Sequence, residues 1–484
     1  MWEFVQEHIW EILIIAHYIL ALVAIVMILL KNINPTKTLS YIIVLAVIPV
    51  LGLVVYYFFG QDYRKFKMFK KRALLNQVNV QSWVEKLKLL EDKAYDVSAK
   101  NLHGNTKIIK LIDEQRYAPV TLYNNAEILV NGKVKFDRLF EDIQNATSSI
   151  HLEYYIIQDD EIGSELIEHL CVKSKQGVEV RINYDPVGSA ISWDALAKLK
   201  EAGVEIYPFM PIYFPKFASK INYRNHRKIV VVDGVIGYVG GINIGDEYVN
   251  APGRRYWRDT HLRIHGQAVG MLQLYFLLDW NFVAGKNVQV KEKWFPKSNV
   301  TNELPIQIVS SGPDTKWANI MEAMFTAINS AKKYVYLTTP YFIPNDEVSL
   351  AMITAAKSGV DVRLLIPKTC DSQIAKHATN SCLLTLLRAG VKIYFYNKGN
   401  IHAKTIVADD VFTTIGTANM DNRSFHLNFE INAMIYHGDT AKQMYDLFIE
   451  DLKDSTPIEL ERWENRGLKQ RLLESICRLW APLL

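Results

Sequence analysis

The sequence predicts an α/β protein of two equivalent halves, each a sheet covered by helices, behind an N-terminal pair of apolar helices. Three observations support this fold class. A spaced motif occurs twice, the same order of short strands and helices surrounds each copy, and long apolar runs are concentrated at the N-terminal end. Strands that alternate with helices are typical of α/β layers, and a repeated order of elements indicates a duplicated domain.

Length and composition set the outer limits of the interpretation. The chain has 484 residues, enough for two or three domains with a large core. Its net charge of +4 is too small to indicate nucleic-acid binding by itself. The four cysteines, Cys171, Cys370, Cys382 and Cys477, show no CxxC spacing. We therefore expect reduced thiols in a domain that faces the cytoplasm, and no disulfide framework.

Residues 1–60 predict a transmembrane helical hairpin. Two apolar runs, Ile12–Leu30 and Leu39–Phe59, each have roughly the 20 residues that cross a bilayer core. The segment between them is short, so the two helices should be antiparallel. A signal peptide is disfavoured, because the opening MWEFVQEH lacks both a basic region and a small-residue cleavage site.

A basic connector, residues 61–116, is expected to follow the hairpin. Its first part carries Arg64, Lys65, Lys67, Lys70, Lys71 and Arg72. The positive-inside rule places this cluster in the cytoplasm, and the N-terminus on the same side. Basic residues beside a membrane also attract anionic lipids, by about 1 kcal/mol each. Between Gln77 and Lys107 the leucine spacing predicts one amphipathic helix.

Residues 117–300 and 301–484 form the two expected halves. In the first half, helices over 136–146, 166–175 and 195–202 alternate with strands over 148–157, 177–185 and 203–209. In the second half, helices over 318–331, 350–357 and 383–389 alternate with strands over 334–342, 359–367 and 390–396. Each series ends in a strand that carries one copy of the motif. We expect the domains to pack so that the motif strands face one another.

The repeated motif is His-x-Lys, followed at fixed offsets by Asp and by Gly-x-x-Asn. The first copy contains His226, Lys228, Asp233 and Asn243, and the second contains His402, Lys404, Asp409 and Asn419. A single His-x-Lys has little meaning, but two copies matched at every spaced position indicate an internal repeat. Each Lys lies two residues after its His, so both side chains share one face of a strand. Each Asp has an odd offset from its His. Although both Asp residues belong to the catalytic motif, we expect them to act structurally at the strand end.

The paired pattern resembles the HKD signature of the phospholipase D superfamily, whose members build one phosphodiesterase site from two such motifs. With its flanking sequence, the chain most resembles the bacterial cardiolipin synthases of that superfamily. The resemblance implies two pseudo-equivalent phospholipase D-like domains, and transfer of a phosphatidyl group between two phosphatidylglycerol molecules to give cardiolipin and glycerol. One departure from the superfamily pattern is Gly241, where Ser is usual; Thr417 occupies that place in the second copy.

A phosphodiester transfer needs a nucleophile, a proton for the leaving oxygen and donors for the phosphate oxygens. Histidine suits the first two tasks because its pKa lies near neutrality, and covalent attack by a ring nitrogen divides the transfer into two easier steps. Lys228 and Lys404 would point with the histidines into a shared cleft. Asn243 and Asn419 would add amide donors that bind the substrate.

The resemblance also implies roles for residues outside the motifs. Asp259 and Glu430 match the carboxylates that orient the histidines. Apart from the resemblance, Arg258 is a candidate contact to phosphate or headgroup, as are Arg254 and Arg255 in the same loop. His226 would carry the covalent phosphatidyl group, while His402 would protonate the departing glycerol. We expect neither metal nor cofactor, because the sequence contains no HExxH and no Walker-type GxxxxGK[ST].

Two segments have alternative interpretations. The first half has an aromatic insert over 208–224 that has no counterpart before the second motif. It is either a loop against the core or an apolar rim for the membrane or acyl chains. At the C-terminus, Leu468, Leu472, Ile476, Leu479 and Leu483 recur at helical spacing. This amphipathic helix either packs onto the core, the interpretation we favour, or lies at a membrane interface.

Competing functions come from several classes. A phospholipase D or a phosphatidylserine synthase would use the same motif residues, because pocket shape and water exclusion select the acceptor. A membrane-tethered nuclease is disfavoured by the absence of a concentrated Lys/Arg stripe, and an inactive scaffold by two complete motifs. We expect phosphatidylglycerol, cardiolipin and anionic membrane lipids as partners, and no nucleic acid. The expected location is the bacterial cell membrane, multi-pass, with the catalytic domains facing the cytoplasm.

Overall fold

The computed structural model describes residue 6 and residues 8–30, 35–47, 78–113, 118–210, 222–285 and 288–481. The chain divides into two compact units. One comprises Met1–Tyr63 with Ile212–Asn222, and the other comprises Arg64–Pro211 with Tyr223–Leu484.

The smaller unit contains two apolar helices, α2 (Ile9–Leu30) and α3 (Pro35–Val47). Ala24 and Ile28 of α2 pack with Leu45 of α3 in a small buried cluster. Within the described residues, α2 is the one helix long and apolar enough to cross a membrane, with a mean hydropathy of 3.0. The two apolar helices of the predicted hairpin therefore form and contact one another.

Parts of the N-terminal prediction lie outside the described residues. The second predicted span, Leu39–Phe59, is helical as far as Val47, and its remainder is outside them. The basic cluster between Arg64 and Arg72 is also outside, as is most of the aromatic insert, residues 211–221.

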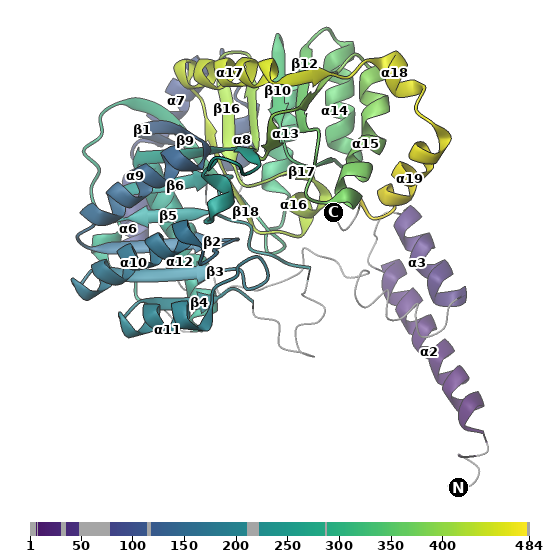
Figure 1. The fold of residues 1–484 in the computed structure, drawn as a ribbon, viewed down its shortest axis with the longest axis horizontal. Helices are drawn as coiled ribbons and strands as arrows, with labels where there is room; N and C mark the ends of the chain where they lie inside the picture. Colours follow the sequence, from purple (N-terminus) through teal and green to yellow (C-terminus); the bar gives the residue numbers. More distant parts are fainter. Residues whose placement is uncertain are drawn as a thin grey trace. The chain divides into compact units, whose positions relative to one another are not determined.

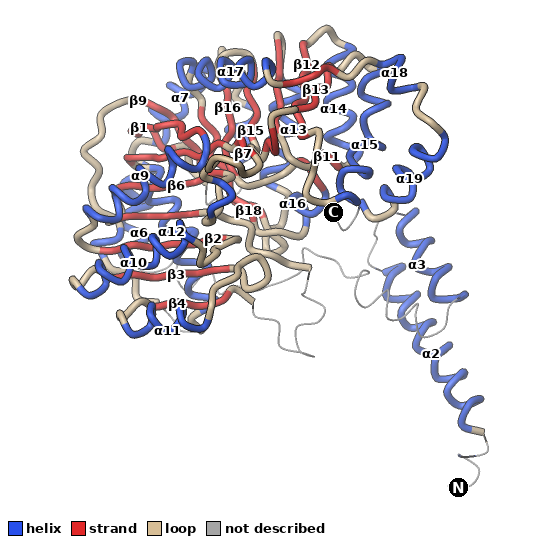
Figure 2. Tube along the Cα trace, in the orientation of Figure 1, coloured by secondary structure: helices blue, strands red, loops and turns tan. Residues whose placement is uncertain are grey.

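One fifteen-stranded sheet runs through the larger unit (Figures 1 and 2). The first half contributes β1 (Thr121–Val130), β2 (Ser149–Tyr154), β3 (Glu179–Tyr184), β4 (Glu205–Pro208), β5 (Ile229–Val232), β6 (Ile236–Gly240) and β8 (Thr260–Gly266). The second half contributes β9 (Glu303–Ser311), β10 (Tyr334–Thr338), β12 (Asp361–Pro367), β13 (Lys392–Tyr396), β15 (Thr405–Ala408), β16 (Phe412–Gly416), β18 (Glu430–Ile435) and β19 (Ser455–Pro457).

The order of the strands shows the duplication directly. From the centre outward, the first half runs β1-β8-β6-β5-β2-β3-β4 and the second runs β9-β18-β16-β15-β10-β12-β13, with β19 added at the edge. Antiparallel pairing of β1 with β9 joins the halves into one sheet, and β16 also packs against β6 and β8. The predicted α/β architecture of two equivalent halves is confirmed.

Helices cover the sheet in the predicted alternation. They are α9 (Asn131–Asn145), α10 (Glu161–Lys175), α11 (Trp193–Glu201), α12 (Ala268–Val283), α13 (Asn319–Ser330), α14 (Asp346–Lys357), α15 (Gln373–Arg388) and α17 (Gly438–Lys453). The side chain of Ser372 accepts a hydrogen bond from the amide of Ala375 and so caps the start of α15. This helix therefore begins well before the start predicted at residue 383.

The helix α12 lies in a core that belongs to both halves. Its side chains are buried continuously from Ala268 to Trp280, and they pack with β5 and β8 of the first half and with β9 of the second. A run buried on every side has no 3.6-residue periodicity, so the sequence analysis did not separate it as a helix.

The connector differs from the single predicted helix. Its described part forms three helices, α6 (Val78–Lys88), α7 (Glu91–Asn101) and α8 (Lys107–Asp113). On α6, Val80 and Trp83 pack into the core around α12, while α8 buries its isoleucines in the core of the second half. The segment after residue 77 therefore packs on both halves, and it forms three helices where one amphipathic helix was predicted.

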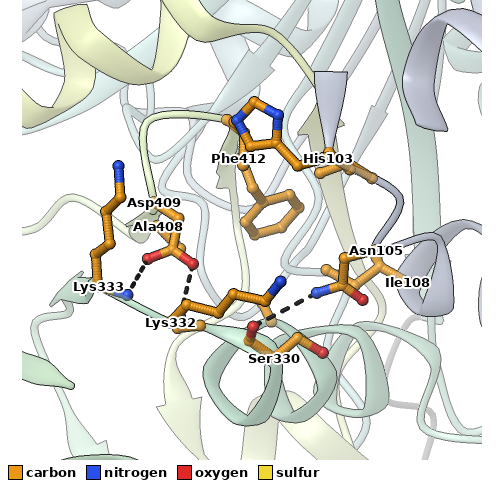
Figure 3. Close-up of a pocket in the computed structure, with 13 residues that line it drawn as sticks. His103, Asn105, Ile108, Ser330, Lys332, Lys333, Ala408, Asp409 and Phe412 are labelled. Atoms are coloured by element: carbon orange, nitrogen blue, oxygen red, sulfur yellow. Dashed lines mark hydrogen bonds between the residues drawn. The ribbon is translucent and has the colours of Figure 1, made fainter. Parts of the chain in front are cut away.

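The motif aspartates lie at β-turns that end the motif strands. Asp233 and Asp409 have φ angles of 53° and 52°, which Asp tolerates better than most residues. The carboxylate of Asp409 accepts hydrogen bonds from the backbone amides of Lys332 and Lys333, at 2.6 and 2.8 Å (Figure 3). It also accepts from the amide of Tyr334 at 2.9 Å. Asp233 accepts equivalent bonds from the amides of residues 147–149.

These contacts correct the placement of both aspartates among the catalytic residues. Each carboxylate fixes the loop that leads into the neighbouring strand, β2 or β10. Asp409 lines a small pocket of about 90 Å³ with Phe412 and His103, and neither aspartate lines the cleft described below.

Replacement of Asp409 by Ala should lower the free energy of unfolding by about 1–3 kcal/mol, because three backbone amides lose their acceptor and Ala is strained at positive φ. Urea or thermal unfolding would measure the change. Asp409→Asn keeps one acceptor oxygen and the turn conformation, so it should lose less than half as much. An Ala variant as stable as the parent protein would contradict this role.

Candidate functional site

The segment that carries His226 pairs with the other half of the molecule. The amide of His226 donates to the carbonyl of Phe429 at 2.9 Å, and the amide of Phe429 donates to the carbonyl of Arg224 at 2.9 Å. Asn225 secures the same segment within the first half, since its side chain donates to Glu153 and its amide to Asp185. His226 is therefore held beside the start of β18.

The second histidine has the reciprocal arrangement. The strand β14 (Gly399–Ile401) pairs in parallel with β7 (Tyr256–Arg258) of the first half. The amide of His402 then donates to the carbonyl of Arg258 at 2.7 Å. Each motif histidine is thus pinned to the backbone that directly precedes a carboxylate of the opposite half.

These carboxylates contact the histidine rings. Nδ1 of His226 lies 2.9 Å from Oε2 of Glu430, and Nδ1 of His402 lies 2.7 Å from Oδ2 of Asp259. A carboxylate that accepts from Nδ1 leaves Nε2 of the ring available to a reacting group. Each ring is also in edge contact with an aromatic side chain: Tyr155 against His226 and Trp257 against His402.

Both rings open onto one cleft of about 370 Å³. Its other lining residues come from both halves and are Tyr155, Ile156, Asn243, Glu247, Tyr248, Trp257, Tyr341, Ile343, Asp371, Ser372, Ala375, Asn419, Asp421, Arg423 and Asn428. The structure therefore brings His226, His402, Asn243 and Asn419 together at one cavity.

The motif lysines lie behind the histidines and are buried. Nζ of Lys228 donates to the carbonyl of His226 at 2.8 Å, and Nζ of Lys404 donates to the carbonyl of His402 at 2.5 Å. Burial, together with the charge of Lys404, lowers the pKa of Lys228 to about 7. Burial lowers the pKa of Lys404 to about 8. Burial disfavours the positive charges of both lysines, so the site favours the binding of an anion that would compensate them.

The motif asparagines have unused hydrogen-bonding capacity at the cleft. Nδ2 of Asn243 donates to the hydroxyl of Tyr248 at 2.8 Å. The Oδ1 atoms of Asn243 and Asn419 are buried, and within the described part of the chain neither has a hydrogen-bond partner. Buried amide oxygens without partners are costly, so hydroxyl donors of a bound molecule are suitable partners for them.

The two histidine–carboxylate pairs differ electrostatically. Burial raises the pKa of Glu430 to about 7, although the charge of Lys228 opposes this. Burial also disfavours the charge of Asp259, but His402 and Lys404 hold its pKa below the usual range. Burial and Lys404 lower the pKa of His402 to about 4, against the opposing effect of Asp259. Burial and the nearby lysines lower the pKa of His226 well below its usual range.

The departure at Gly241 has a steric cause. A Cβ atom at this position would overlap the carboxylate of Asp259, so only glycine fits. In the second half, Thr417 occupies the equivalent position and its hydroxyl donates to Oε2 of Glu430 at 2.5 Å. Glu430 therefore accepts a hydrogen bond from the hydroxyl of Thr417, whereas Gly241 offers no side chain to Asp259.

Arg258 is not placed as the sequence analysis expected. It is buried and does not line the cleft. Its Nε donates to Asp451 at 2.8 Å, and its Nη1 donates to the carbonyl of Asp259 at 2.7 Å. The prediction of a substrate contact was wrong, because this side chain instead fixes the backbone that presents Asp259.

Several cleft residues were not identified from the sequence. Arg423 adds a cation at the cleft, four residues after Asn419 of the second motif. Tyr341 and Asp371 lie on the same wall, with the tyrosine hydroxyl 2.6 Å from Oδ1 of the aspartate. Each lies within four residues after the end of a strand, and that position was the available signal. Within the described residues, no three His, Cys, Asp or Glu side chains form a group that could hold a metal ion.

Comparisons with known proteins agree on the fold and the family. The family model described as "Cardiolipin synthase, PLD-like domain" matches residues 139–265 and 324–452, and a model described as "Phospholipase_D-nuclease N-terminal" matches 19–61. The chain is 43% identical over 463 residues to a cardiolipin synthase of Halalkalibacterium halodurans, covering 95% of this chain and 91% of that protein. It is 43% identical over 461 residues to cardiolipin synthase 2 of Bacillus anthracis, covering 94% and 88%.

A solved structure shows the same fold at low sequence identity. The phosphatidylserine synthase of Haemophilus influenzae superposes with a TM-score of 0.60 at 15% identity, covering 78% of this chain and 100% of that one. With the two matched domains and the identities above 40%, the chain belongs to the cardiolipin synthase family of the phospholipase D superfamily.

Proposed function

We propose that this protein transfers a phosphatidyl group between two phosphatidylglycerol molecules and releases cardiolipin and glycerol. The observation that carries the proposal is the pair of histidines at one cleft, each backed by a carboxylate of the opposite half and by a buried lysine. The named relatives support the choice of lipid. We further propose that α2 and the segment after it anchor the chain in the membrane as two passes, with the catalytic halves in the cytoplasm.

The transfer follows as two displacements at phosphorus. Nε2 of His226 attacks the phosphate of the first phosphatidylglycerol, forming a P–N bond while the bond to the glycerol oxygen breaks. His402 gives a proton to that oxygen, so glycerol leaves neutral. A hydroxyl of the second phosphatidylglycerol then returns a proton to His402 and attacks phosphorus, which breaks the P–N bond and gives cardiolipin. Lys228 and Lys404 stabilise the added charge on the phosphate oxygens.

The electrostatic difference between the half-sites supports this assignment of roles. His402 faces Asp259, whose low pKa keeps it ionised, and this charge partly opposes the fall in the pKa of His402. His226 faces Glu430, whose raised pKa provides less negative charge, and the neighbouring lysines lower the pKa of the ring further. A neutral imidazole is the nucleophilic form, whereas an imidazolium is the proton donor. A bound phosphate would offset the two lysines and raise the pKa of His402.

Glycerol chemistry fits the cleft better than a nucleic acid does. The lining of the cleft includes three carboxylates, Glu247, Asp371 and Asp421. Carboxylates accept hydrogen bonds from glycerol hydroxyls but repel a polyanionic strand. These three carboxylates therefore favour a glycerol hydroxyl, over a phosphate-rich molecule, as the group that accepts the phosphatidyl group.

Purified protein given phosphatidylglycerol alone should produce cardiolipin and glycerol in equal amounts, measured by mass spectrometry. His226→Ala and His402→Ala should each abolish product formation, whereas His169→Ala, which changes a histidine outside the cleft, should not. Phosphatidic acid as the main product would replace the proposal with hydrolysis. A histidine variant with more than a tenth of the parent activity would contradict a single shared site.

The covalent intermediate should form on His226. Protein denatured in base, where a P–N bond is more stable than in acid, should carry label from phosphatidylglycerol labelled at phosphorus on the peptide that contains this residue. Label on the peptide of His402 would reverse the roles. Absence of label from both peptides would contradict the two-step route.

The activity should decline above neutral pH. In the enzyme without bound substrate, Lys228 and Lys404 lose their protons near pH 7 and 8. The value of kcat/KM should therefore fall as pH rises through that range. Lys404→Met should reduce kcat/KM by about 100-fold or more. Removing this charge also raises the pKa of Lys228, so the remaining alkaline limb should move to higher pH. A profile of kcat/KM that stays flat from pH 7 to 9 would contradict a requirement for protonated Lys228 and Lys404.

A further inference from the structure

The C-terminal helix α19 (Leu468–Arg478) contacts the protein through its polar face. Glu474 is only 2% exposed, and its carboxylate accepts from Arg466 at 2.8 Å and from Gln470 at 3.0 Å. Cys477 is also buried, one turn further on. A helix on a water-soluble protein normally buries its apolar stripe and exposes its charges. Here the apolar stripe is exposed, and the buried residues of the helix are Glu474 and Cys477.

The opposite face of α19 and the turn after it are apolar and exposed. Leu468 and Leu479 are 80% and 78% exposed, at the two ends of a stripe that recurs every three or four residues. The exposed apolar side chains of the stripe are Leu468, Leu472, Leu473, Ile476, Leu479 and Trp480. A contiguous exposed stripe of this kind indicates an interaction surface.

Basic side chains accompany the stripe. Lys469, Arg471 and Arg478 are exposed on the same helix. The one acidic residue of α19, Glu474, is buried in its ion pair with Arg466 and adds no exposed negative charge. The helix therefore has an exposed apolar stripe with Trp480 at one end, and all its exposed charged side chains are basic. This pattern is typical of a helix that lies in the surface of an anionic bilayer. A second copy of the helix would bring like charges together.

The buried face of α19 lies beside the catalytic cleft. The helix α19 packs along α15 (Figure 1), and Cys477 and Ala481 share a small core with Ile343 and Ala375, which line the cleft. Asn422, next to the cleft residues Asp421 and Arg423, donates to the carbonyl of Ala481 at 3.3 Å.

We propose that α19 is an interfacial helix that inserts its apolar stripe into an anionic phospholipid bilayer and holds the cleft wall at the membrane surface. The proposal rests on the proposed function in one respect, that the substrate is a membrane lipid. Lipid headgroups would then reach the cleft along the side formed by α15 and α19, without leaving the bilayer surface.

Depth-dependent quenching in the full chain would test the contact. A fluorophore on Leu472→Cys should be quenched by about half or more when nitroxide-labelled lipid is present in phosphatidylglycerol vesicles, and less in phosphatidylcholine vesicles. The same fluorophore on Lys442→Cys, an exposed position of α17, is the matched control and should stay unquenched. Emission at Leu472→Cys that is insensitive to nitroxide lipid would overturn the proposal, whether water, a second copy or another part of the chain surrounds the label.

Charge substitution gives an independent readout. Leu472→Glu with Ile476→Glu should lower turnover of phosphatidylglycerol in vesicles by about tenfold or more and change turnover in detergent micelles by less than about twofold. Leu89→Glu with Trp193→Glu adds the same charges at apolar positions that are as exposed, and should change neither. Equal losses in vesicles and micelles would mean a structural role and overturn the proposal. If the parent protein makes no cardiolipin in either form, the proposed function fails, and the quenching result still decides the role of α19.

Discussion

The site depends on the crossed backbone pairing between the halves. The segment before His226 bonds to the residue before Glu430, and the segment before His402 bonds to the residues before Asp259. Neither half contains a complete histidine–carboxylate pair, so neither could form one alone. The antiparallel joint of β1 and β9 and the shared core around α12 hold the halves in the register that this crossing requires.

The buried charges of the site are suited to binding an anion. Lys228 and Lys404 face Asp259 and Glu430 in a region that excludes water, where isolated charges are costly. This cost appears as lowered pKa values of both lysines and a raised pKa of Glu430. In the proposed reaction, a phosphodiester would bring one negative charge to the two lysines and favour their protonated forms. The same charge would raise the pKa of His402 and so prepare the proposed proton donor.

The repeat made much of this structure predictable from the sequence. Strict spacing of His, Lys and Asn identified the residues at the cleft and at its base, because the two-residue period of a strand fixes which side chains share a face. The duplicated order of elements predicted two matching half-sheets. Resemblance alone pointed to Asp259 and Glu430, and nothing in their spacing identified which histidine each would contact. That contact is set by long-range pairing between strands.

The errors have physical causes of the same kind. Arg258 was assigned to the substrate because it is an arginine near a site, yet burial beside Asp451 gives it an intramolecular partner. The helix α12 was missed because uniform burial removes periodicity. One helix was predicted in the connector where three form, and Trp83 and the isoleucines of α8 pack in different cores. Local pattern does not report such tertiary contacts.

The two half-sites have the same backbone arrangement of histidine and carboxylate, but their carboxylates differ in environment. Asp259 is one methylene shorter than Glu430, and the backbone at Gly241 approaches it so closely that no side chain fits. The longer Glu430 leaves room for the hydroxyl of Thr417. The pKa of Asp259 is held low by His402 and Lys404, whereas burial raises the pKa of Glu430 even though the hydroxyl of Thr417 acts to lower it. A symmetric pair would give either histidine the same tendency to hold a proton. The two carboxylates therefore make the half-sites electrostatically unequal, and in the proposed mechanism this difference would separate the nucleophile from the proton donor.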